Sequence, residues 1–289
     1  MQPARTALAV IPSVCVLVAT VAAAAGAGAG CRCGGGGSQD GGGGGSSDAA
    51  VDAGAGSADA GGASDSGTLP PECLVGLISD DATANLTPVF ALLDAMTDVG
   101  YDHMPDNTTA RFTENAALIG AFDVVVWYQH NRLISTAEHD TLEAWLQGGG
   151  RLLVTGHDSL GDPDDPLLAA LVRSATVGDV VGVTDFTITD GTHPIATGPY
   201  GAHGTGEAVT TPTNDIDAAE ADTAAGAVTV AAYTDGHDKI IATALPGGGV
   251  VVYWNGNGQD MSYVSPDWGA GQTAMREMFQ NAVAWMCGP

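Results

Sequence analysis

The stretch "LEAWLQGGGRLLVTGHDSLGD", Leu142–Asp162, decides the fold of this chain. It begins with apolar residues at helical spacing, continues through three glycines and a short apolar run, and stops at Gly-His-Asp-Ser. A helix that ends at glycine and leads into a strand covered on both faces has this pattern. We therefore expect Arg151–Thr155 to be a central strand of a parallel sheet, with Gly156 in a tight turn at its carboxyl end.

Earlier apolar segments predict further strands at Leu74–Ile78, Tyr101–Met104 and Phe122–Tyr128. The first and the third are continuous apolar runs, which are typical of strands buried on both faces. Helical segments alternate with these strands along the chain. This order predicts a parallel sheet with helices on both faces and right-handed crossovers.

The helices between these strands have recognisable starts and ends. The first is expected to begin at Thr87 with Pro88 after it, because proline is tolerated in the first helical turn, and to be closed by Gly100. In the next helix, Ser135 and Glu138 are three positions apart. This spacing predicts a capping box, in which the two side chains each accept a backbone hydrogen bond at the start of the helix.

The pattern changes in the last third of the chain. Val228–Tyr233 and Ile240–Ala244 flank Asp235-Gly236, which predicts a hairpin, and Val250–Trp254 is one more buried strand. A closing helix carries on one face the apolar residues Met275, Met278, Phe279, Ala282 and Met286. The predicted fold class is α/β, a flavodoxin-like three-layer sandwich with a mostly parallel sheet and a late β-hairpin.

Residues 1–30 are expected to be a secretory signal rather than part of the fold. Arg5 precedes an apolar run at Ala7–Ala25, and small residues follow the run. The run is nearly long enough to span a bilayer, so an uncleaved membrane anchor is the alternative. Gly28-Ala29-Gly30-Cys31 resembles the bacterial lipobox, in which the cysteine becomes lipid-modified, although lipoboxes prefer an aliphatic residue where Gly28 stands.

Residues 31–68 consist mostly of Gly, Ala, Ser and Asp and offer almost nothing to bury. Such a segment cannot offset its ordering entropy, so we expect a flexible tether. The folded domain then spans residues 69–289. The protein is expected to be exported, either as a cell-envelope lipoprotein attached through Cys31 or as an extracellular protein.

The chain carries 34 Asp and Glu against 8 Lys and Arg, a formal net charge of −26. Nucleic acids and anionic membrane surfaces need clustered cations on their partners, so this balance argues against both. Contact with a membrane is expected only through the N-terminal lipid or anchor. Asp162-Pro163-Asp164-Asp165 is a minor candidate for calcium, but no segment has the spacing of a calcium loop, and we expect neither a metal site nor a cofactor.

Cys73 and Cys287 bracket the predicted domain, and neither belongs to a Cys-x-x-Cys pair. Zinc binding and thioredoxin-type redox chemistry are therefore not expected. In an oxidising compartment we expect the two cysteines to form a disulfide that joins the ends of the domain. Two free, buried thiols are the alternative.

Four segments of the domain carry a resemblance to a known family. They are "FDVVVWYQH" (122–130), "LEAWLQGGGRLLVTGHDS" (142–159), "DGTHPIATG" (190–198) and "GGGVVVYWNGN" (247–257). Their order and spacing resemble the class I glutamine amidotransferase-like superfamily, and the ThuA-like branch looks most similar. The resemblance covers roughly residues 73–287 and implies the α/β fold of that superfamily.

The chain departs from this family at the positions that carry chemistry. The amidotransferases place a cysteine nucleophile at the elbow after the central strand, with His and Glu partners. Here the elbow reads Gly156-His157-Asp158-Ser159, and no cysteine stands there. The last strand of ThuA-like proteins often ends in Leu-Gly-His, where this chain has Asn255-Gly256-Asn257. Glutaminase activity is therefore not expected.

Polar residues follow the apolar runs, at the edge of the predicted sheet where ligands bind in parallel α/β folds. The candidate ligand-binding residues there are Asp80, Asp81, Gln129, His130, Asn131, Ser159, Asn255 and Asn257. Because the ends of adjacent strands meet, we expect His157 to lie near Asp80 or Asp81, His130 and Asn255. The alternative is that these residues only form turns.

His157 and Asp158 are the candidate catalytic residues. The imidazole of His157 can gain or lose a proton near neutrality, and Asp80 or Asp158 would orient it or hold a cation. Asp158 is also a candidate for an attacking carboxylate at the elbow. Together with Ser159 they do not form a catalytic triad, because triad members converge from separate loops. His193 is a further candidate for ligand binding, since Pro194 holds it in an extended conformation; a structural turn is the alternative.

Two classes of function remain open at this point. The first is an exported domain that binds a small polar ligand or a partner without glutaminase activity. The second is a hydrolase or isomerase that acts on a small polar, carbohydrate-like substrate by His and Asp acid–base chemistry. Fold alone does not separate them. The missing nucleophile at the elbow favours the first.

Overall fold

The computed structural model describes residues 72–79, 86–104, 112–130, 132–156, 158–183, 185–210, 215–256 and 270–288. The predicted signal, Cys31 and the predicted tether lie outside these residues. The described helices and strands are, in chain order, β1 (Cys73–Ser79), α1 (Thr87–Asp94), β2 (Val99–Met104), α3 (Ala116–Ile119), β3 (Val124–Tyr128), α4 (Thr136–Gln147), β4 (Arg151–Gly156), α5 (Pro166–Val172), β5 (Asp179–Val181), β6 (Asp185–Ile188), β7 (Thr197–Gly198), β8 (Gly201–Ala202), β9 (Ala208–Thr210), β10 (Asp215–Asp217), the 3₁₀ helix η2 (Thr223–Ala225), β11 (Val228–Tyr233), β12 (Asp238–Ala244), β13 (Val250–Asn255) and α7 (Ala270–Cys287).

The main sheet of the described part of the chain has nine strands in the order β2-β1-β3-β4-β13-β12-β11-β6-β9. Strands β2, β1, β3, β4 and β13 are parallel neighbours, and β4 lies between β3 and β13. From β13 onward the pairing is antiparallel. The prediction that Arg151–Thr155 is a central strand of a parallel sheet is confirmed, and so is the late hairpin, which is β11 and β12.

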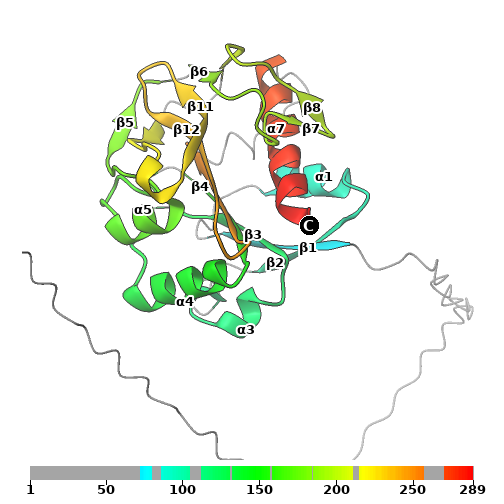
Figure 1. Cartoon of the computed structure of the whole chain (residues 1–289), viewed down its shortest axis with the longest axis vertical. Coiled ribbons are helices and arrows are strands. Elements are labelled where there is room, and N and C mark those ends of the chain that lie inside the picture. Colours follow the sequence, from blue (N-terminus) through cyan, green and yellow to red (C-terminus); the bar gives the residue numbers. More distant parts are fainter. Residues whose placement is uncertain are drawn as a thin grey trace, which may run out of the picture. The chain divides into compact units, whose positions relative to one another are not determined.

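Helices cover both faces of this sheet, as Figure 1 shows for α4 and α5 on one side and α1 and α7 on the other. Side chains alternate along each buried strand, so every strand contributes to two cores. In β3, Val124 and Val126 belong to the cluster packed against α1 and α7. Val125 and Trp127 belong to the cluster packed against α4 and α5. We call these two sides of the sheet the α7 face and the α4 face.

The capping box at the start of α4 is present as predicted, with Ser135 and Glu138 exchanging hydrogen bonds. The expectations for α1 were less accurate. This helix begins at Thr87 with Leu86 as its N-cap residue, and it ends at Asp94 instead of continuing to Gly100. Gly100 lies in β2, where it pairs with β1, because tertiary pairing of the strand outweighs the local preference of glycine for a helix end.

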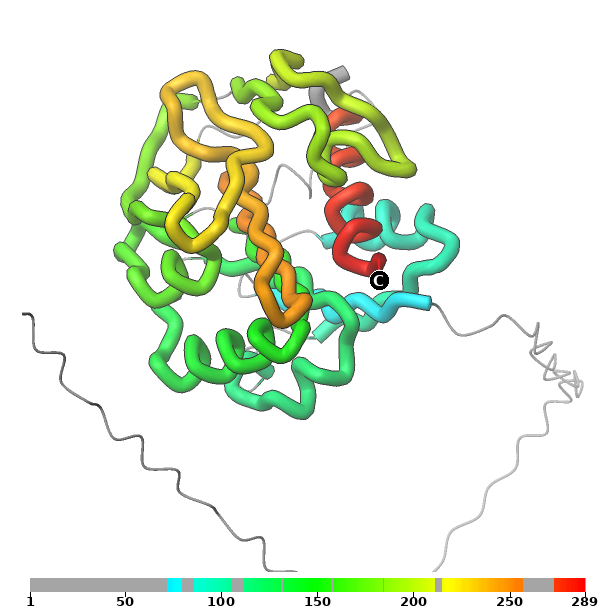
Figure 2. The backbone as a smooth tube through the Cα atoms, viewed as in Figure 1, coloured from blue at the N-terminus to red at the C-terminus, as the bar shows by residue number. Residues whose placement is uncertain are grey.

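A disulfide joins Cys73 to Cys287, with 5.6 Å between their Cα atoms and a sequence separation of 214 residues. It connects the first residue of β1 to the last residue of α7, and Figure 2 shows the carboxyl end of α7 beside β1. The predicted disulfide is therefore confirmed in the structure. No helix among the described residues combines the length and apolar composition needed to cross a membrane.

Candidate functional site at the carboxyl edge of the sheet

The structure describes about half of the residues that the sequence singled out. Those outside the described residues are Asp80, Asp81, Asn131, His157 and Asn257. Those within them are Gln129, His130, Asp158, Ser159, His193 and Asn255. The expected proximity of His157 to Asp80 or Asp81 therefore stays a prediction, and the site is built here from the described residues.

The elbow after β4 packs directly on the end of β3. Gly156 has a φ of 153°, and a Cβ atom added there would lie 1.7 Å from the carbonyl oxygen of Gln129. Ser159 contacts the same atom: its hydroxyl donates a hydrogen bond to the carbonyl oxygen of Gln129 at 3.0 Å. The elbow thus requires glycine at position 156, both for its backbone conformation and for the lack of space. Ser159 is buried and holds the turn.

A buried carboxyl group, Asp217 of β10, lies beneath this turn on the α4 face. Its Oδ1 accepts from the backbone N–H of Leu160 at 3.1 Å, and its Oδ2 accepts from the backbone N–H of Ser159 at 3.3 Å and from the hydroxyl of Tyr253. Burial raises the pKa of Asp217 to about 7, and these hydrogen bonds oppose that rise. The group is therefore partly protonated near neutrality.

Asn255, which the sequence indicated as a ligand contact, has its polar atoms engaged within the protein. Its Oδ1 accepts from the backbone N–H of Asp217 at 2.8 Å, and its Nδ2 donates to the carbonyl oxygens of Asp217 and Asp238 at 2.7 and 2.8 Å. The side chain is completely buried. Asn255 thus joins β13 to β10 and β12, and these internal hydrogen bonds occupy its polar atoms.

Three carboxylates meet at the carboxyl edge above Asp217. Asp158, Asp179 and Asp215 each place a carboxylate oxygen within 4.8 Å of the others. Asp158 follows the elbow with a φ of 52°, while Asp179 and Asp215 come from β5 and β10, which pair antiparallel. We call these three residues the carboxylate cluster. The fold brings together three groups that are spread over 57 positions of the sequence, from Asp158 to Asp215.

The charges of the cluster change its protonation. Burial and then the carboxylates of Asp215 and Asp179 raise the pKa of Asp158 to about 6, while His130 acts in the opposite direction. Burial and Asp215 also raise the pKa of Asp179. The three oxygens are close enough to hold one cation, but acidic side chains are common on a chain of this charge, and their proximity alone assigns no ion.

Sequence reasoning missed Asp179, Asp215 and Asp217. The only local signal was the alternation of polar and apolar residues in Asp215-Ile216-Asp217, which is typical of a half-buried strand. Nothing in that alternation indicates that the strand pairs with β5 and lies beneath the elbow. These three residues belong to the site because of long-range pairing.

Gln129 and His130 are at this edge, as the sequence predicted. Gln129 is completely buried, and its Nε2 donates to the carbonyl oxygen of Arg132. Its Oε1 is buried and has no hydrogen-bond partner among the residues that the structure describes. His130 is only partly buried and is near enough to Asp158 to affect the pKa of that carboxyl. Among the described candidates, the fold thus brings His130 near Asp158, besides joining Ser159 to the backbone of Gln129.

His193 lies away from this edge. Its Nδ1 accepts from the backbone N–H of Ile195 at 3.2 Å, and its ring packs edge-on against Trp285, with 4.8 Å between ring centroids. Trp285 is two residues from Cys287, which the disulfide ties to the first residue of β1. His193 is therefore near the amino ends of the parallel strands, and burial lowers its pKa. The structure therefore does not bring His193 together with the candidates at the carboxyl edge.

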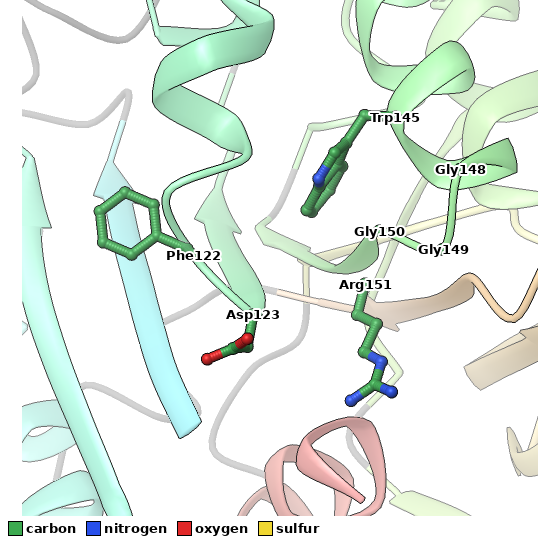
Figure 3. A pocket seen from close by; sticks show the side chains of 7 residues that line it. All are labelled: Phe122, Asp123, Trp145, Gly148, Gly149, Gly150 and Arg151. Carbon is green, nitrogen blue, oxygen red and sulfur yellow. The ribbon is translucent and has the colours of Figure 1, made fainter. Parts of the chain in front are cut away.

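A cavity of about 280 Å³ opens at the amino ends of β3 and β4 (Figure 3). It is lined by Phe122, Asp123, Trp145, Gly148, Gly149, Gly150 and Arg151. The charged side chains in it serve the fold: Asp123 accepts from the backbone N–H of Leu74 at 2.8 Å, and Arg151 donates to the carbonyl oxygen of Met286. This cavity is at the opposite edge from the carboxylate cluster.

No protein-family profile and no curated protein matches the chain. Several solved structures share its fold. The cytoplasmic protein STM3548 from Salmonella typhimurium is 14% identical with a TM-score of 0.51, and the alignment covers 73% of this chain and 98% of that one. The mmIFT52 N-terminal domain is 14% identical with a TM-score of 0.52, covering 74% of this chain and 98% of that one.

A protein described as putative ThuA-like, from Bacteroides uniformis, is 8% identical with a TM-score of 0.49, and the alignment covers 76% of this chain and 93% of that one. At these identities the first two comparisons show a shared α/β fold, and none of the three assigns an activity.

Proposed function

We propose that this protein is an exported, membrane-tethered domain of amidotransferase-like fold that binds a small polar ligand at the carboxyl edge of its sheet and lacks glutaminase activity. The observation that supports it is the carboxylate cluster, in which Asp158, Asp179 and Asp215 converge from three separate segments. The ligand is one that offers hydrogen-bond donors or positive charge, such as a polyol or an amine, because carboxylates only accept when ionised.

The cluster has the character of a binding site because it costs stability in the empty protein. Burial, and then the like charges of neighbouring carboxylates, raise the pKa values of Asp158 and Asp179, so ionising these two groups in the folded protein lowers its stability. Clusters of carboxylates whose pKa values are raised by burial and by one another are typical of functional sites. A donor-rich ligand relieves that repulsion and gains charge-assisted hydrogen bonds.

The absence of glutaminase activity follows from the cysteines. Glutaminase chemistry of the superfamily needs a thiolate at the elbow, where this chain has Gly156-His157-Asp158-Ser159. Cys73 and Cys287 are joined in the disulfide, which consumes the thiols of the described domain. Incubation of the purified chain with glutamine is expected to release no glutamate above the level of buffer.

The export part of the proposal rests on the apolar segment, Cys31 and the predicted tether. A mature protein that begins at a lipid-modified Cys31 is the expected product, and mass spectrometry of the N-terminus measures it directly. A different first residue, or an unmodified Cys31, would contradict the lipoprotein assignment. Either result would have no bearing on the proposed ligand site.

Binding at the cluster is tested with Asp179→Asn and Asp215→Asn, with Asp102→Asn as the matched control on the exposed side of β2. Without ligand, both cluster variants are expected to be slightly more stable than the parent, by about 0.5 kcal/mol, because a like-charge contact is removed. Hexoses, polyols, diamines and calcium chloride are screened by thermal shift and calorimetry. Any compound that binds the parent should bind the two cluster variants at least tenfold more weakly. Binding equal to that of the parent and the Asp102 control would place the ligand elsewhere.

A hydrolase or isomerase is the second candidate, and the pKa of Asp158 favours it. A carboxyl group with a pKa of about 6 beside His130 can donate and accept protons near neutrality, as a general acid or base must. Turnover of a chromogenic or reducing-sugar substrate by the parent, lost in Asp158→Asn and retained in Asp102→Asn, would establish catalysis. Binding without turnover supports the first proposal.

A further inference from the structure

A row of polar side chains crosses the four inner parallel strands close to their carboxyl ends. Ser79 of β1 pairs in register with Tyr128 of β3, Tyr128 with Thr155 of β4, and Thr155 with Trp254 of β13. Residues in register on adjacent strands point to the same face and lie about 5 Å apart. The four side chains therefore form one line across the sheet, which we call the polar row.

The polar row lies on the α7 face, opposite to the carboxyl group of Asp217. Alternation along the strands determines this: Trp254 belongs to the core packed against α7, whereas its neighbour Tyr253, which donates to Asp217, belongs to the other core. The carboxylate cluster and the polar row share no residue. An inference from the row therefore stands independently of the proposed function.

Two members of the row carry buried polar atoms that find no partner in the part of the chain that the structure describes. Among these residues, the hydroxyl Oγ1 of Thr155 and the indole Nε1 of Trp254 have no hydrogen-bond partner, and the two side chains are register neighbours that are 1% and 0% exposed. Ser79 and Tyr128 engage other groups. Buried polar atoms are nearly always satisfied in folded proteins, because an unmade hydrogen bond costs free energy. Two adjacent exceptions at the carboxyl edge of the sheet indicate a missing acceptor.

The chemistry of Thr155 Oγ1 and Trp254 Nε1 indicates which kind of acceptor group would satisfy both atoms. An indole N–H can only donate, and the hydroxyl of Thr155 can donate as well, so both are satisfied by a group with two acceptor oxygens. Lys239 brings a cationic side chain to the same place: it is completely buried, its Nζ donates to the carbonyl oxygen of Asn255 at 2.7 Å, and it lies 5.7 Å from the Trp254 ring. Such surroundings favour an anionic acceptor over a neutral one.

We propose that the polar row is a binding site for the carboxylate group of a small organic acid, whose oxygens accept from Thr155 Oγ1 and Trp254 Nε1. Each of these residues is followed by the last residue of its strand, so the site is at the end of β4 and β13. The hydrogen bonds to an ionised acceptor supply the affinity, and the pair of donors supplies the orientation.

Thr243 shows why the pairing matters and provides the control. It is also a buried threonine of the main sheet, and its Oγ1 has no hydrogen-bond partner within the described ranges, but its register neighbour on β13 is the apolar Val251. A single hydroxyl among apolar side chains offers one hydrogen bond and no second donor. Thr243→Val therefore removes the same group as Thr155→Val without touching the polar row.

The test uses the purified full chain labelled with ¹⁵N, in which the five tryptophans give indole N–H signals and Trp254→Phe assigns the one that matters. Acetate, lactate and pyruvate are titrated beside their neutral counterparts acetamide, lactamide and pyruvamide. At least one carboxylate is expected to shift the Trp254 signal saturably, with its amide at least tenfold weaker. Thr155→Val should weaken that binding about tenfold or more, because a hydrogen bond to a charged group is lost.

Thr243→Val is expected to bind the carboxylate like the parent. If Thr155→Val folds poorly, Thr155→Ser takes its place in the test, and because it keeps a hydroxyl it should retain part of the affinity of the parent. The proposal is overturned if no carboxylate moves the Trp254 signal, if the amides bind equally well, or if Thr155→Val and Thr243→Val behave alike. A crystal structure with only a water molecule between Thr155 Oγ1 and Trp254 Nε1, and no response to the acids, would overturn it too.

Discussion

The side chain of Asn255 and the backbone of Asp217 hold each other by a reciprocal pair of hydrogen bonds. Asn255 Oδ1 accepts from the N–H of Asp217 at 2.8 Å, and Asn255 Nδ2 donates to the carbonyl oxygen of Asp217 at 2.7 Å. This pair mimics the pairing of a β-strand and attaches the short strand β10 to the end of β13. Because Asp217 in turn holds the elbow after β4, the amide of Asn255 positions the turn that carries Asp158.

Replacement of Asn255 by alanine is expected to destabilise the protein strongly. The backbone N–H and carbonyl of Asp217 and the carbonyl of Asp238 would lose their partner in a buried place, and each unsatisfied group costs about 1–3 kcal/mol. We expect the free energy of unfolding, measured with urea, to fall by about 3–5 kcal/mol. A loss below about 1 kcal/mol would show that Asn255 is not structural and would return it to the ligand candidates.

Asp217 makes stability depend on pH. Its pKa is about 7 in the folded protein and 3.8 for an ordinary aspartate, so between these values the folded state retains a proton that the unfolded chain has released. The free energy of unfolding therefore falls as pH rises from about 4 to 7, by up to about 4 kcal/mol from this group. The contribution is fully present below pH 4.

Asp217→Asn is the matching variant, because an amide resembles the protonated carboxyl group and cannot titrate. Its stability relative to the parent should increase steadily from pH 4 to pH 7 in urea unfolding experiments. A constant difference across that range would contradict the raised pKa. Asp102→Asn, on the exposed side of β2, controls for the general effect of removing one negative charge.

Gly156→Ala is expected to disrupt the elbow. The added Cβ would lie 1.7 Å from the carbonyl oxygen of Gln129, and the φ of 153° is unfavourable for alanine. We expect a loss of more than about 3 kcal/mol or failure to fold, because backbone at the end of β3 would have to move. Gly204→Ala is the control, since a Cβ there meets nothing within 4 Å. Equal stability of the two variants in thermal unfolding would contradict the packing described for the elbow.

Removal of the disulfide is expected to lower stability by about 2–5 kcal/mol, because the bond closes a loop of 214 residues in the unfolded chain. Urea unfolding of the Cys73→Ala, Cys287→Ala double variant measures the change, and the parent in the presence of a reductant provides an independent comparison. The double variant should no longer respond to the reductant. A parent whose two cysteines react with a thiol reagent in the absence of reductant would contradict the bond.

Local signals in the sequence were sufficient for the parallel half of the sheet. Continuous apolar runs placed β1, β3, β4 and β13 within one or two residues of their observed bounds, because strands buried on both faces need such runs. Ser135 and Glu138 marked the start of α4 through contacts within one helical turn. The end of α1 was misplaced because Gly100 is used in a strand that pairs with β1, and that pairing has no local signature.

The sequence by itself determined which strands are buried and where α4 begins, since each depends on neighbours within a few residues. It also predicted a glycine turn after β4, but the close approach of the Gln129 carbonyl oxygen, which excludes a Cβ atom at Gly156, is a tertiary contact. The tertiary structure alone decided what gathers around that elbow. It paired β5 with β10 to assemble the carboxylate cluster, engaged Asn255 in the backbone of Asp217, and aligned Thr155 with Trp254. These relationships depend on strand order and register between segments far apart in the chain, which no local pattern of residues encodes.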